Sequence, residues 1–115
     1  MADDCLFCSL VAGTIPSTRV FENERIVAFR DIHPDAPTHV QIIPKRHITS
    51  LADAADTDAD LLGEMLLVAR DIAAQEGIAE TGYRCVINTR KHGGQLVPHL
   101  HLHVMGGRQM GESHG

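Results

Sequence analysis

The sequence predicts an α+β protein built from about five mostly antiparallel strands, one long helix packed on that sheet and a short N-terminal helix. Three observations support this fold class. Apolar residues recur at helical spacing over 57–76, and several short β-prone runs are separated by turn residues. The length of 115 residues, with 43% hydrophobic and 22% charged residues, suits one domain that spans 1–115.

The first half of the chain is expected to hold the short helix and three strands. Residues 5–12 are apolar and stop at Gly13, which favours a short helix there. Residues 23–25 separate two β-prone runs in the pattern of a hairpin. The elements expected after the helix are strands at 19–22 and 26–30, a loop at 31–38 and a strand at 40–43 that ends at Pro44.

The second half is expected to hold the long helix and two strands. Gly77 is a suitable residue to follow the end of that helix. The apolar stripe of the long helix is formed mainly by Leu61, Met65, Val68 and Ile72. The elements expected in order are a helix at 57–76, a strand at 83–88, a turn at 89–94 and a strand at 98–105.

The overall charge disfavours some classes of partner. With a formal net charge of -5 and a pI near 5.8, the chain lacks the basic excess of a general nucleic-acid or anionic-membrane binder. The longest purely apolar run, residues 65–69, is too short to span a bilayer, and the first residues lack the basic and apolar regions of a signal peptide. We therefore expect no nucleic-acid or membrane partner and a cytoplasmic location.

Three histidines alternate with apolar residues over 99–105. With 8 histidines in 115 residues, chance would give such a string roughly 0.04 times. Because side chains alternate between the faces of a strand, His99, His101 and His103 are expected to share one face. The apolar residues expected to pack in the core opposite them are Leu100, Leu102 and Val104.

Three functions fit this string of histidines. It can form a polar strand face exposed to solvent. It can hold a metal ion, but the outer two imidazoles would start about 13 Å apart on a strand, so only an adjacent pair such as His101 and His103 suits one ion. It can also divide its roles, with the central histidine as a nucleophile and its neighbours as supports.

An imidazole nucleophile suits chemistry at phosphorus. Neutral histidine is nucleophilic at pH 7, and its bond to phosphorus can be both formed and hydrolysed. Such a nucleophile needs an acceptor on its second ring nitrogen, and the phosphoryl oxygens need hydrogen-bond donors. Candidate donors just upstream are Asn88, Gly93, Gly94 and Gln95.

These residues resemble the signature of the histidine triad (HIT) superfamily, and most of all its Hint branch of histidine triad nucleotide-binding proteins. The resemblance implies a homodimeric α+β fold in which two subunits join their sheets. It also implies a purine nucleoside phosphoramidase or nucleotidyl hydrolase activity, with a purine mononucleotide or its phosphoramidate or acyl derivative as substrate. The matching segments are 29–32, 36–39, 43–47, Asn88, 93–95, 99–105 and 106–110.

The resemblance further implies roles for individual residues. His101 would be the nucleophile that takes up the nucleoside monophosphate, and His103 would contact the phosphate. Asn88 and the Gly94 amide would help to hold that phosphate. The residues that would bind the nucleoside are Asp31, on the ribose, and Phe7, Leu10, Ile15, Phe29 and Ile32, around the base.

Two departures from the family pattern concern the leaving group. Leu96 stands where many members have Ser or Thr, so that position has no hydroxyl to protonate a leaving group. The chain has no Trp, whereas Hint relatives can carry an aromatic tail that reaches the partner subunit's site. A nucleotide-binding regulatory module with little physiological turnover would keep the same residues and is the alternative function.

Two of the three cysteines form a Cys-x-x-Cys pair, Cys5 and Cys8, with the spacing of a zinc knuckle. A tetrahedral structural site needs two further ligands, which His47 and His99 supply if the N-terminal segment folds over the sheet. A subset of HIT proteins is similar in making this pairing, so we expect structural Zn²⁺. The alternatives are a redox pair, which would lack its usual βαβ context, and two buried thiols without metal. Cys85 is expected to pack in a strand.

Overall fold

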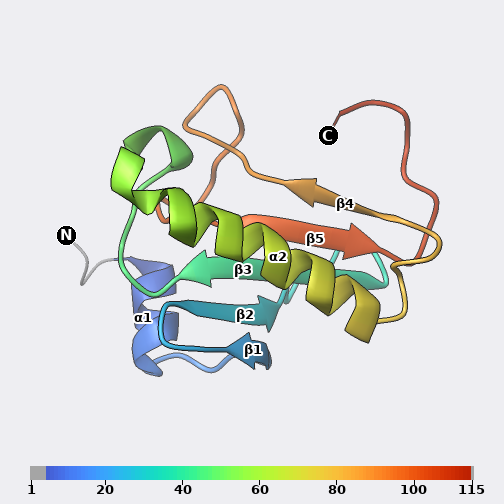
Figure 1. The fold of residues 1–115 in the computed structure, drawn as a ribbon, viewed down its shortest axis with the longest axis horizontal. Helices are drawn as coiled ribbons and strands as arrows, with labels where there is room; N and C mark the ends of the chain where they lie inside the picture. Colours follow the sequence, from blue (N-terminus) through green and yellow to red (C-terminus); the bar gives the residue numbers. More distant parts are fainter. Residues whose placement is uncertain (1–4, 115) are drawn as a thin grey trace.

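The structure, a computed structural model, describes residues 5–114 and forms one sheet with two helices (Figure 1). The strands pair antiparallel in the order β1-β2-β3-β5-β4. The predicted fold class is therefore confirmed. The elements are α1 (Leu6–Ala12), β1 (Arg19–Glu22), β2 (Ile26–Arg30), β3 (Thr38–Pro44), η2 (Leu51–Asp53), η3 (Asp56–Asp58), α2 (Ala59–Gln75), β4 (Tyr83–Val86) and β5 (Leu102–Gly106).

The long helix α2 lies across one face of the sheet, and α1 packs on the other face at one end (Figure 1). Alternation along the strands separates the two cores. For example, Ala28 and Ile42 belong to the core under α2, whereas Phe29 and Ile43 belong to the core under α1. Within residues 5–114, no helix packs on the part of the second face formed by β5 and β4, where His103 lies.

The core under α2 contains the apolar residues that the sequence singled out. Met65 and Ile72 are each 1% exposed, and Gly77 takes the left-handed backbone conformation, with φ of 76°, just after the helix ends. Leu100, Leu102 and Val104 are buried in the same core, as predicted. No helix among residues 5–114 is long and apolar enough to cross a membrane.

The boundaries of the last strand differ from the prediction. β5 begins at Leu102 instead of residue 98, so His99 and His101 precede the regular strand and only His103 lies within it. Pro98 has no N–H to donate, and the Leu100 N–H donates to the Ile48 carbonyl instead of to a neighbouring strand. The three histidines therefore sit on differently arranged backbone.

Smaller differences occur at three other ends. β3 begins at Thr38, two residues earlier than predicted, and β4 ends at Val86, two residues earlier. The helix α2 begins at Ala59 after the short turn η3, where the Asp58 carboxylate accepts a hydrogen bond from the Ala55 N–H.

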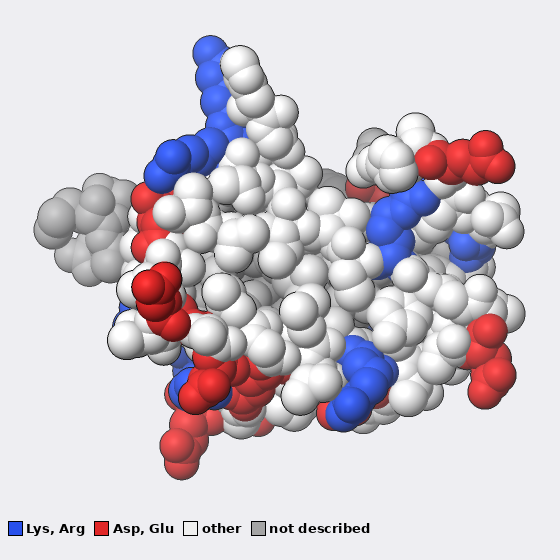
Figure 2. Space-filling view, turned by 45° about the horizontal axis from the view of Figure 1, so that its top comes forward, with Lys and Arg blue, Asp and Glu red and all other residues white. Residues whose placement is uncertain are grey.

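On the face drawn in Figure 2, acidic and basic groups lie mainly around the margins of a broad uncharged area.

Candidate active site and metal centre

His99 is fully buried between the sheet and α1. Its Nε2 lies 2.8 Å from the Pro44 carbonyl oxygen, which can only accept, so Nε2 carries the proton. Nδ1 then carries no proton and has a lone pair available. It lies 3.3 Å from Cys5 Sγ and 3.5 Å from Cys8 Sγ. Burial lowers the pKa of His99, so the ring is neutral at pH 7. The arrangement leaves His99 Nδ1 able to bind a metal ion together with the two cysteine sulfurs.

His101 is held with the opposite nitrogen free. Its Nδ1 lies 2.7 Å from the His99 carbonyl oxygen and must donate to it, which leaves the lone pair on Nε2. The edge of Phe7 packs against the ring, with ring centroids 5.3 Å apart. Burial lowers the pKa of His101, so this imidazole is neutral at pH 7. A neutral ring with one nitrogen oriented and the other unprotonated has the form that a nucleophile needs.

His103 is oriented by a chain of hydrogen bonds that begins at a backbone N–H. The Asp35 N–H donates to His39 Nδ1 over 3.0 Å, so Nδ1 accepts and the ring N–H of His39 is on Nε2. That Nε2 lies 2.9 Å from His103 Nδ1 and donates to it. Burial lowers the pKa of His103 to about 4, so the ring is neutral at pH 7 and presents Nε2–H. His103 is thus a hydrogen-bond donor, suited to a phosphoryl oxygen.

The tautomer of His103 provides a direct test of this chain. In a His39→Leu variant, Nδ1 of His103 loses its donor, and we expect the ring to become a mixture of Nδ1–H and Nε2–H forms. The ¹⁵N shifts of the His103 ring report this change, because protonated and unprotonated ring nitrogens differ widely. A His39→Gln variant, whose side-chain amide can still donate, is expected to retain the Nε2–H form. An unchanged His103 tautomer in the His39→Leu variant would contradict the series of hydrogen bonds from the Asp35 N–H through His39 to His103.

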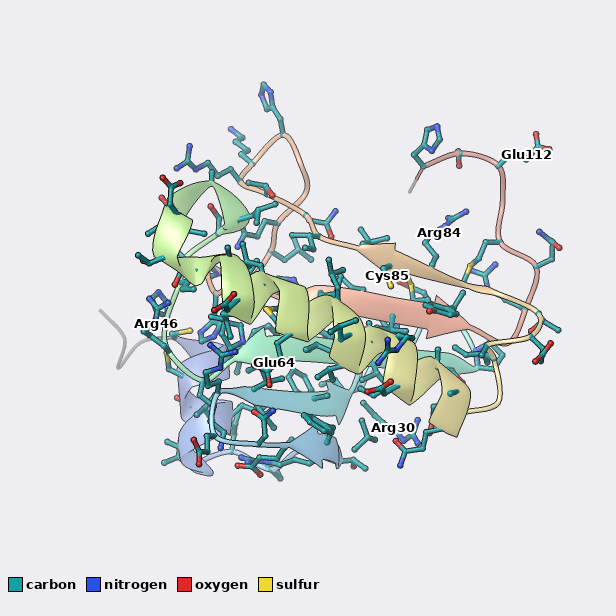
Figure 3. All side chains as sticks on the ribbon, viewed as in Figure 1. Arg30, Arg46, Glu64, Arg84, Cys85 and Glu112 are labelled. Carbon is teal, nitrogen blue, oxygen red and sulfur yellow. The ribbon has the colours of Figure 1, made fainter. Side chains whose placement is uncertain are left out.

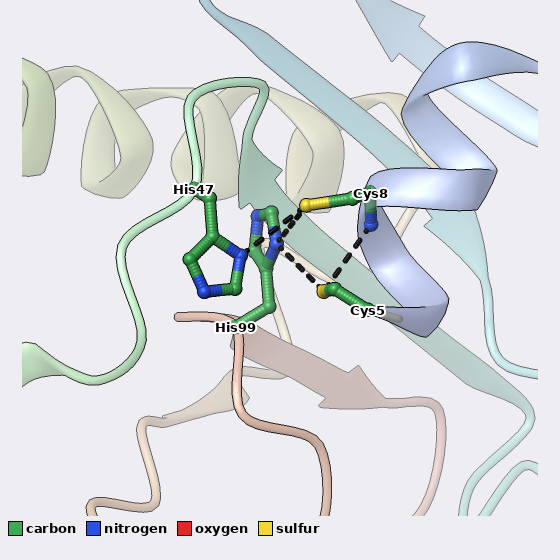
Figure 4. Close-up of side chains that lie close together, drawn as sticks. All are labelled: Cys5, Cys8, His47 and His99. Atoms are coloured by element: carbon green, nitrogen blue, oxygen red, sulfur yellow. Dashed lines mark hydrogen bonds between the residues drawn. The ribbon is translucent and has the colours of Figure 1, made fainter. Parts of the chain in front are cut away.

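The N-terminal segment brings the two cysteines to the two predicted histidines (Figure 4). One ligand atom from each of Cys5, Cys8, His47 and His99 lies within 4.8 Å of the others. His47 Nδ1 lies 3.2 Å from Cys8 Sγ. Ligand atoms with bonds of 2.0 to 2.3 Å to one tetrahedral ion stand roughly 3.3 to 3.8 Å apart. Two thiols and two imidazole nitrogens at nearly these separations fit Zn²⁺. Cys85, predicted to pack in a strand, is exposed on β4.

A pocket of about 450 Å³ opens beside the triad, between α1 and the end of β2. Asp31 stands in it, where one carboxylate oxygen accepts from the Gln41 side chain and the other from the His33 N–H. Ile32 is 84% exposed and therefore only borders the pocket. The pocket lining includes His103 and the residues predicted around the nucleoside: Asp31, Phe7, Leu10, Ile15, Phe29 and Ile32.

Gln41 is a site residue that sequence reasoning missed. It is 9% exposed, donates to Asp31 over 2.7 Å, and its Oε1 has no hydrogen-bond partner among the described residues. The signal available was a polar residue inside an otherwise apolar strand, 40–43. His39, 5% exposed on the same strand, is the other residue whose role the structure supplies.

The predicted phosphate donors upstream of the triad line two different pockets. Asn88 lines a second pocket with His103, and its amide nitrogen donates to the Gly93 carbonyl. Gly94 and Gln95 line a different pocket, beside Thr49 and Asp53. The Gly94 N–H donates to the Lys91 carbonyl, and the Gln95 amide bridges neighbouring backbone groups. In this arrangement Gln95 shapes the loop.

The five-stranded sheet, its two helices and the histidine string at 99–103 are those of a HIT family hydrolase. The HIT domain family matches residues 12–110, and the chain belongs to that family. It is 47% identical over 111 residues to the purine nucleoside phosphoramidase of Escherichia coli (strain K12), across 96% of this chain and 93% of that protein. It is 50% identical over 107 residues to the 14 kDa zinc-binding protein of Zea mays, across 91% of this chain and 83% of that one.

Solved structures agree with this assignment. A HIT family hydrolase from Legionella pneumophila Philadelphia 1 superposes with a TM-score of 0.95 and 52% identity, over 97% of this chain and all of that one. A HIT family hydrolase from Clostridium thermocellum superposes with a TM-score of 0.94 and 41% identity, over 97% of each chain. The chain is therefore a HIT family hydrolase.

Proposed function

We propose that this hydrolase cleaves the P–N or P–O bond at the α-phosphate of purine nucleoside monophosphate derivatives through a covalent intermediate on His101. The observation that carries the proposal is the hydrogen bond from His101 Nδ1 to the His99 carbonyl. It leaves the unprotonated Nε2 of His101 as the attacking atom, on a ring whose centroid is 5.0 Å from that of His103, which lines the pocket that suits a nucleoside.

The reaction consists of two displacements at phosphorus. His101 Nε2 attacks the phosphorus, the bond to the leaving group breaks, and the His101 ring becomes a cation whose Nδ1–H stays on the His99 carbonyl. The leaving nitrogen or oxygen takes a proton from water, because Leu96 has no hydroxyl to offer and the neutral His103 ring keeps its Nε2–H as a hydrogen-bond donor. Water then attacks the phosphorus, the P–Nε2 bond breaks, and the nucleoside monophosphate and a proton are released.

The pocket supports a purine nucleotide as the substrate. Asp31 can accept hydrogen bonds from the ribose hydroxyls, and the apolar walls around Phe7 and Phe29 suit a flat purine. His103 would donate to the phosphate, with Asn88 beside it. The Gly94 amide can join them only if its bond to the Lys91 carbonyl opens.

A structural Zn²⁺ on Cys5, Cys8, His47 and His99 is part of the proposal. The donor set fits that ion, and the name of the maize relative supports it. With four protein ligands the ion has no open position for water, so its contribution is to fix His99 and the segment α1. The His99 carbonyl in turn orients His101. His99 thus links the metal centre to the nucleophile, the first through its ring and the second through its backbone carbonyl.

We further propose that the chain is a single HIT domain over 1–115, acts in the cytoplasm and forms a homodimer through β4. That strand is an edge of the sheet, with Tyr83 37% exposed and Cys85 exposed (Figure 1). Two β4 strands that pair side by side would join two sheets. The mass in solution is expected to be twice the 12.5 kDa of the chain, measured by light scattering after size exclusion; a monomer at micromolar concentration would contradict the dimer.

A turnover assay tests the proposed function. Adenosine and guanosine 5′-phosphoramidates are expected to be hydrolysed to the nucleoside monophosphate and the free amine, followed by ³¹P NMR. AMP binding is measured in parallel by calorimetry. Binding of AMP without hydrolysis of any phosphoramidate or acyl derivative would instead indicate the regulatory module.

A further inference from the structure

The nucleoside pocket and a second pocket on the same face of the sheet have some of their lining residues in common. This second pocket has a volume of about 380 Å³. Asp35, His39 and His103 line both pockets, so the two meet at the histidine that is placed to contact the phosphate. The second pocket is otherwise lined by Arg84, Val86, Asn88, Met105, Arg108 and Met110.

The two arginines of this pocket differ from the other arginines of the chain. Of eight arginines, six form a salt bridge with a carboxylate: Arg19, Arg25, Arg30, Arg46, Arg70 and Arg90. Within residues 5–114, Arg84 and Arg108 have no carboxylate at salt-bridge distance. Arg84 donates to the Gly111 carbonyl, beside the C-terminal segment (Figure 3), and Arg108 donates to the Asp35 and Gln109 carbonyls. Their positive charge is therefore not neutralised by a side chain.

The strand register places one of these arginines on the same face of the sheet as His103. In the pairing of β4 with β5, Val86 lies opposite His103 and Arg84 lies opposite Met105. Arg84 is thus on the same face as His103 and about 7 Å further along the strand, since a strand rises roughly 3.3 Å per residue. An arginine side chain spans that distance and can meet a group two or three atoms from the phosphorus.

The second pocket is available to a leaving group. In-line displacement puts the leaving atom on the side of the phosphorus opposite the attacking nitrogen, so the leaving group and the nucleoside need separate space. If the nucleoside fills the first pocket, the second pocket, which His103 also lines, can take the leaving group. Asp35 brings one negative charge to its lining, against two positive charges from Arg84 and Arg108. A group with a negative charge is therefore favoured there.

We infer that Arg84 and Arg108 form a leaving-group subsite for a carboxylate, so that the preferred substrates are purine nucleoside 5′-phosphoramidates of amino acids with a free α-carboxylate. This inference rests on the proposed function. The carboxylate is two bonds from the leaving nitrogen, and a guanidinium can bind it through two parallel N–H···O bonds. The amide of the same amino acid has nearly the same shape and no charge.

The test compares the adenosine 5′-phosphoramidates of glycine and of glycinamide. For the wild type, kcat/KM is expected to be about tenfold higher for the glycine compound, as for a partly exposed charge-assisted pair. R84Q and R108Q are each expected to bring this ratio close to one, and 0.5 M NaCl to lower it in the wild type. R70Q is the matched control, because Arg70 is exposed on α2 and pairs with Asp71; its ratio is expected to equal that of the wild type.

The outcomes separate this inference from the proposed function. A wild-type ratio at or below one, with both compounds hydrolysed, would overturn the subsite and leave the hydrolase function intact. A high ratio that persists in both R84Q and R108Q would also overturn it. Hydrolysis of neither compound overturns the function and the subsite together. Circular dichroism of R84Q and R108Q shows that the variants compared are folded, and the ratio within each variant cancels differences in active fraction.

Discussion

Replacing His101 by alanine is expected to lower kcat for an adenosine 5′-phosphoramidate by at least about a thousandfold. Among the three imidazoles, His101 is the one whose unprotonated nitrogen remains available. The unprotonated nitrogen of His99 faces the two cysteines, and that of His103 accepts from His39. Without it no phosphorus–nitrogen intermediate can form. AMP binding is expected to persist, because Asp31, Phe7 and Phe29 still line the nucleoside pocket. Single-turnover kinetics and calorimetry measure the two quantities.

The matched control for this substitution is His92→Ala. His92 is exposed in the loop after β4 and has no predicted role in the site, so its removal should leave turnover unchanged. Rapid quenching into base followed by mass spectrometry should detect the nucleotidyl adduct on His101 in the wild type, since a P–N bond to imidazole is labile in acid. Substantial turnover by His101→Ala would exclude His101 as the nucleophile.

The different roles of the three histidines were only partly predictable. Alternation in 99–105 correctly placed the intervening apolar residues in the core. The choice of His101 as the nucleophile comes from the family resemblance and stays a prediction. Alternation did not indicate which nitrogen of each ring is free. That depends on carbonyls distant in sequence or on irregular backbone, such as Pro44 for His99 and the His99 carbonyl for His101. Strand periodicity carries no information about such contacts.

The same limit explains why Gln41 was missed. His39 belongs to a segment that matches the family, but its role, like that of Gln41, comes from the pairing of β3 with β5, which sets His39 opposite Met105 and Gln41 opposite His103. That register joins residues more than sixty positions apart. Gly94 and Gln95 were expected near the phosphate from their place in the sequence and from the family resemblance. Their hydrogen bonds hold them in the loop, where they line another pocket, so their contact with a phosphate stays a prediction.

The second large effect is expected from the metal centre. Cys5→Ser and Cys8→Ser are each expected to remove Zn²⁺ and to lower the thermal midpoint by roughly 10 °C or more, since a structural site contributes several kcal/mol to folding. Cys85→Ser is the matched control, because Cys85 lies on β4 away from the cluster. Metal content by mass spectrometry and a thermal melt give the two readouts. A melting temperature unchanged in both variants would contradict a structural role.

Metal content also separates two kinds of histidine chemistry. A single ion per chain that disappears in the Cys5→Ser, Cys8→Ser double variant would leave His101 and His103 free of metal, as the proposed nucleophile and phosphate donor require. A second ion that survives in that variant would favour a metalloenzyme that uses His101 and His103. The structure argues for the first result. His103 Nδ1 accepts from His39 and His101 Nδ1 donates to a carbonyl, so a shared ion would have to bind through both Nε2 atoms and displace the proton on His103.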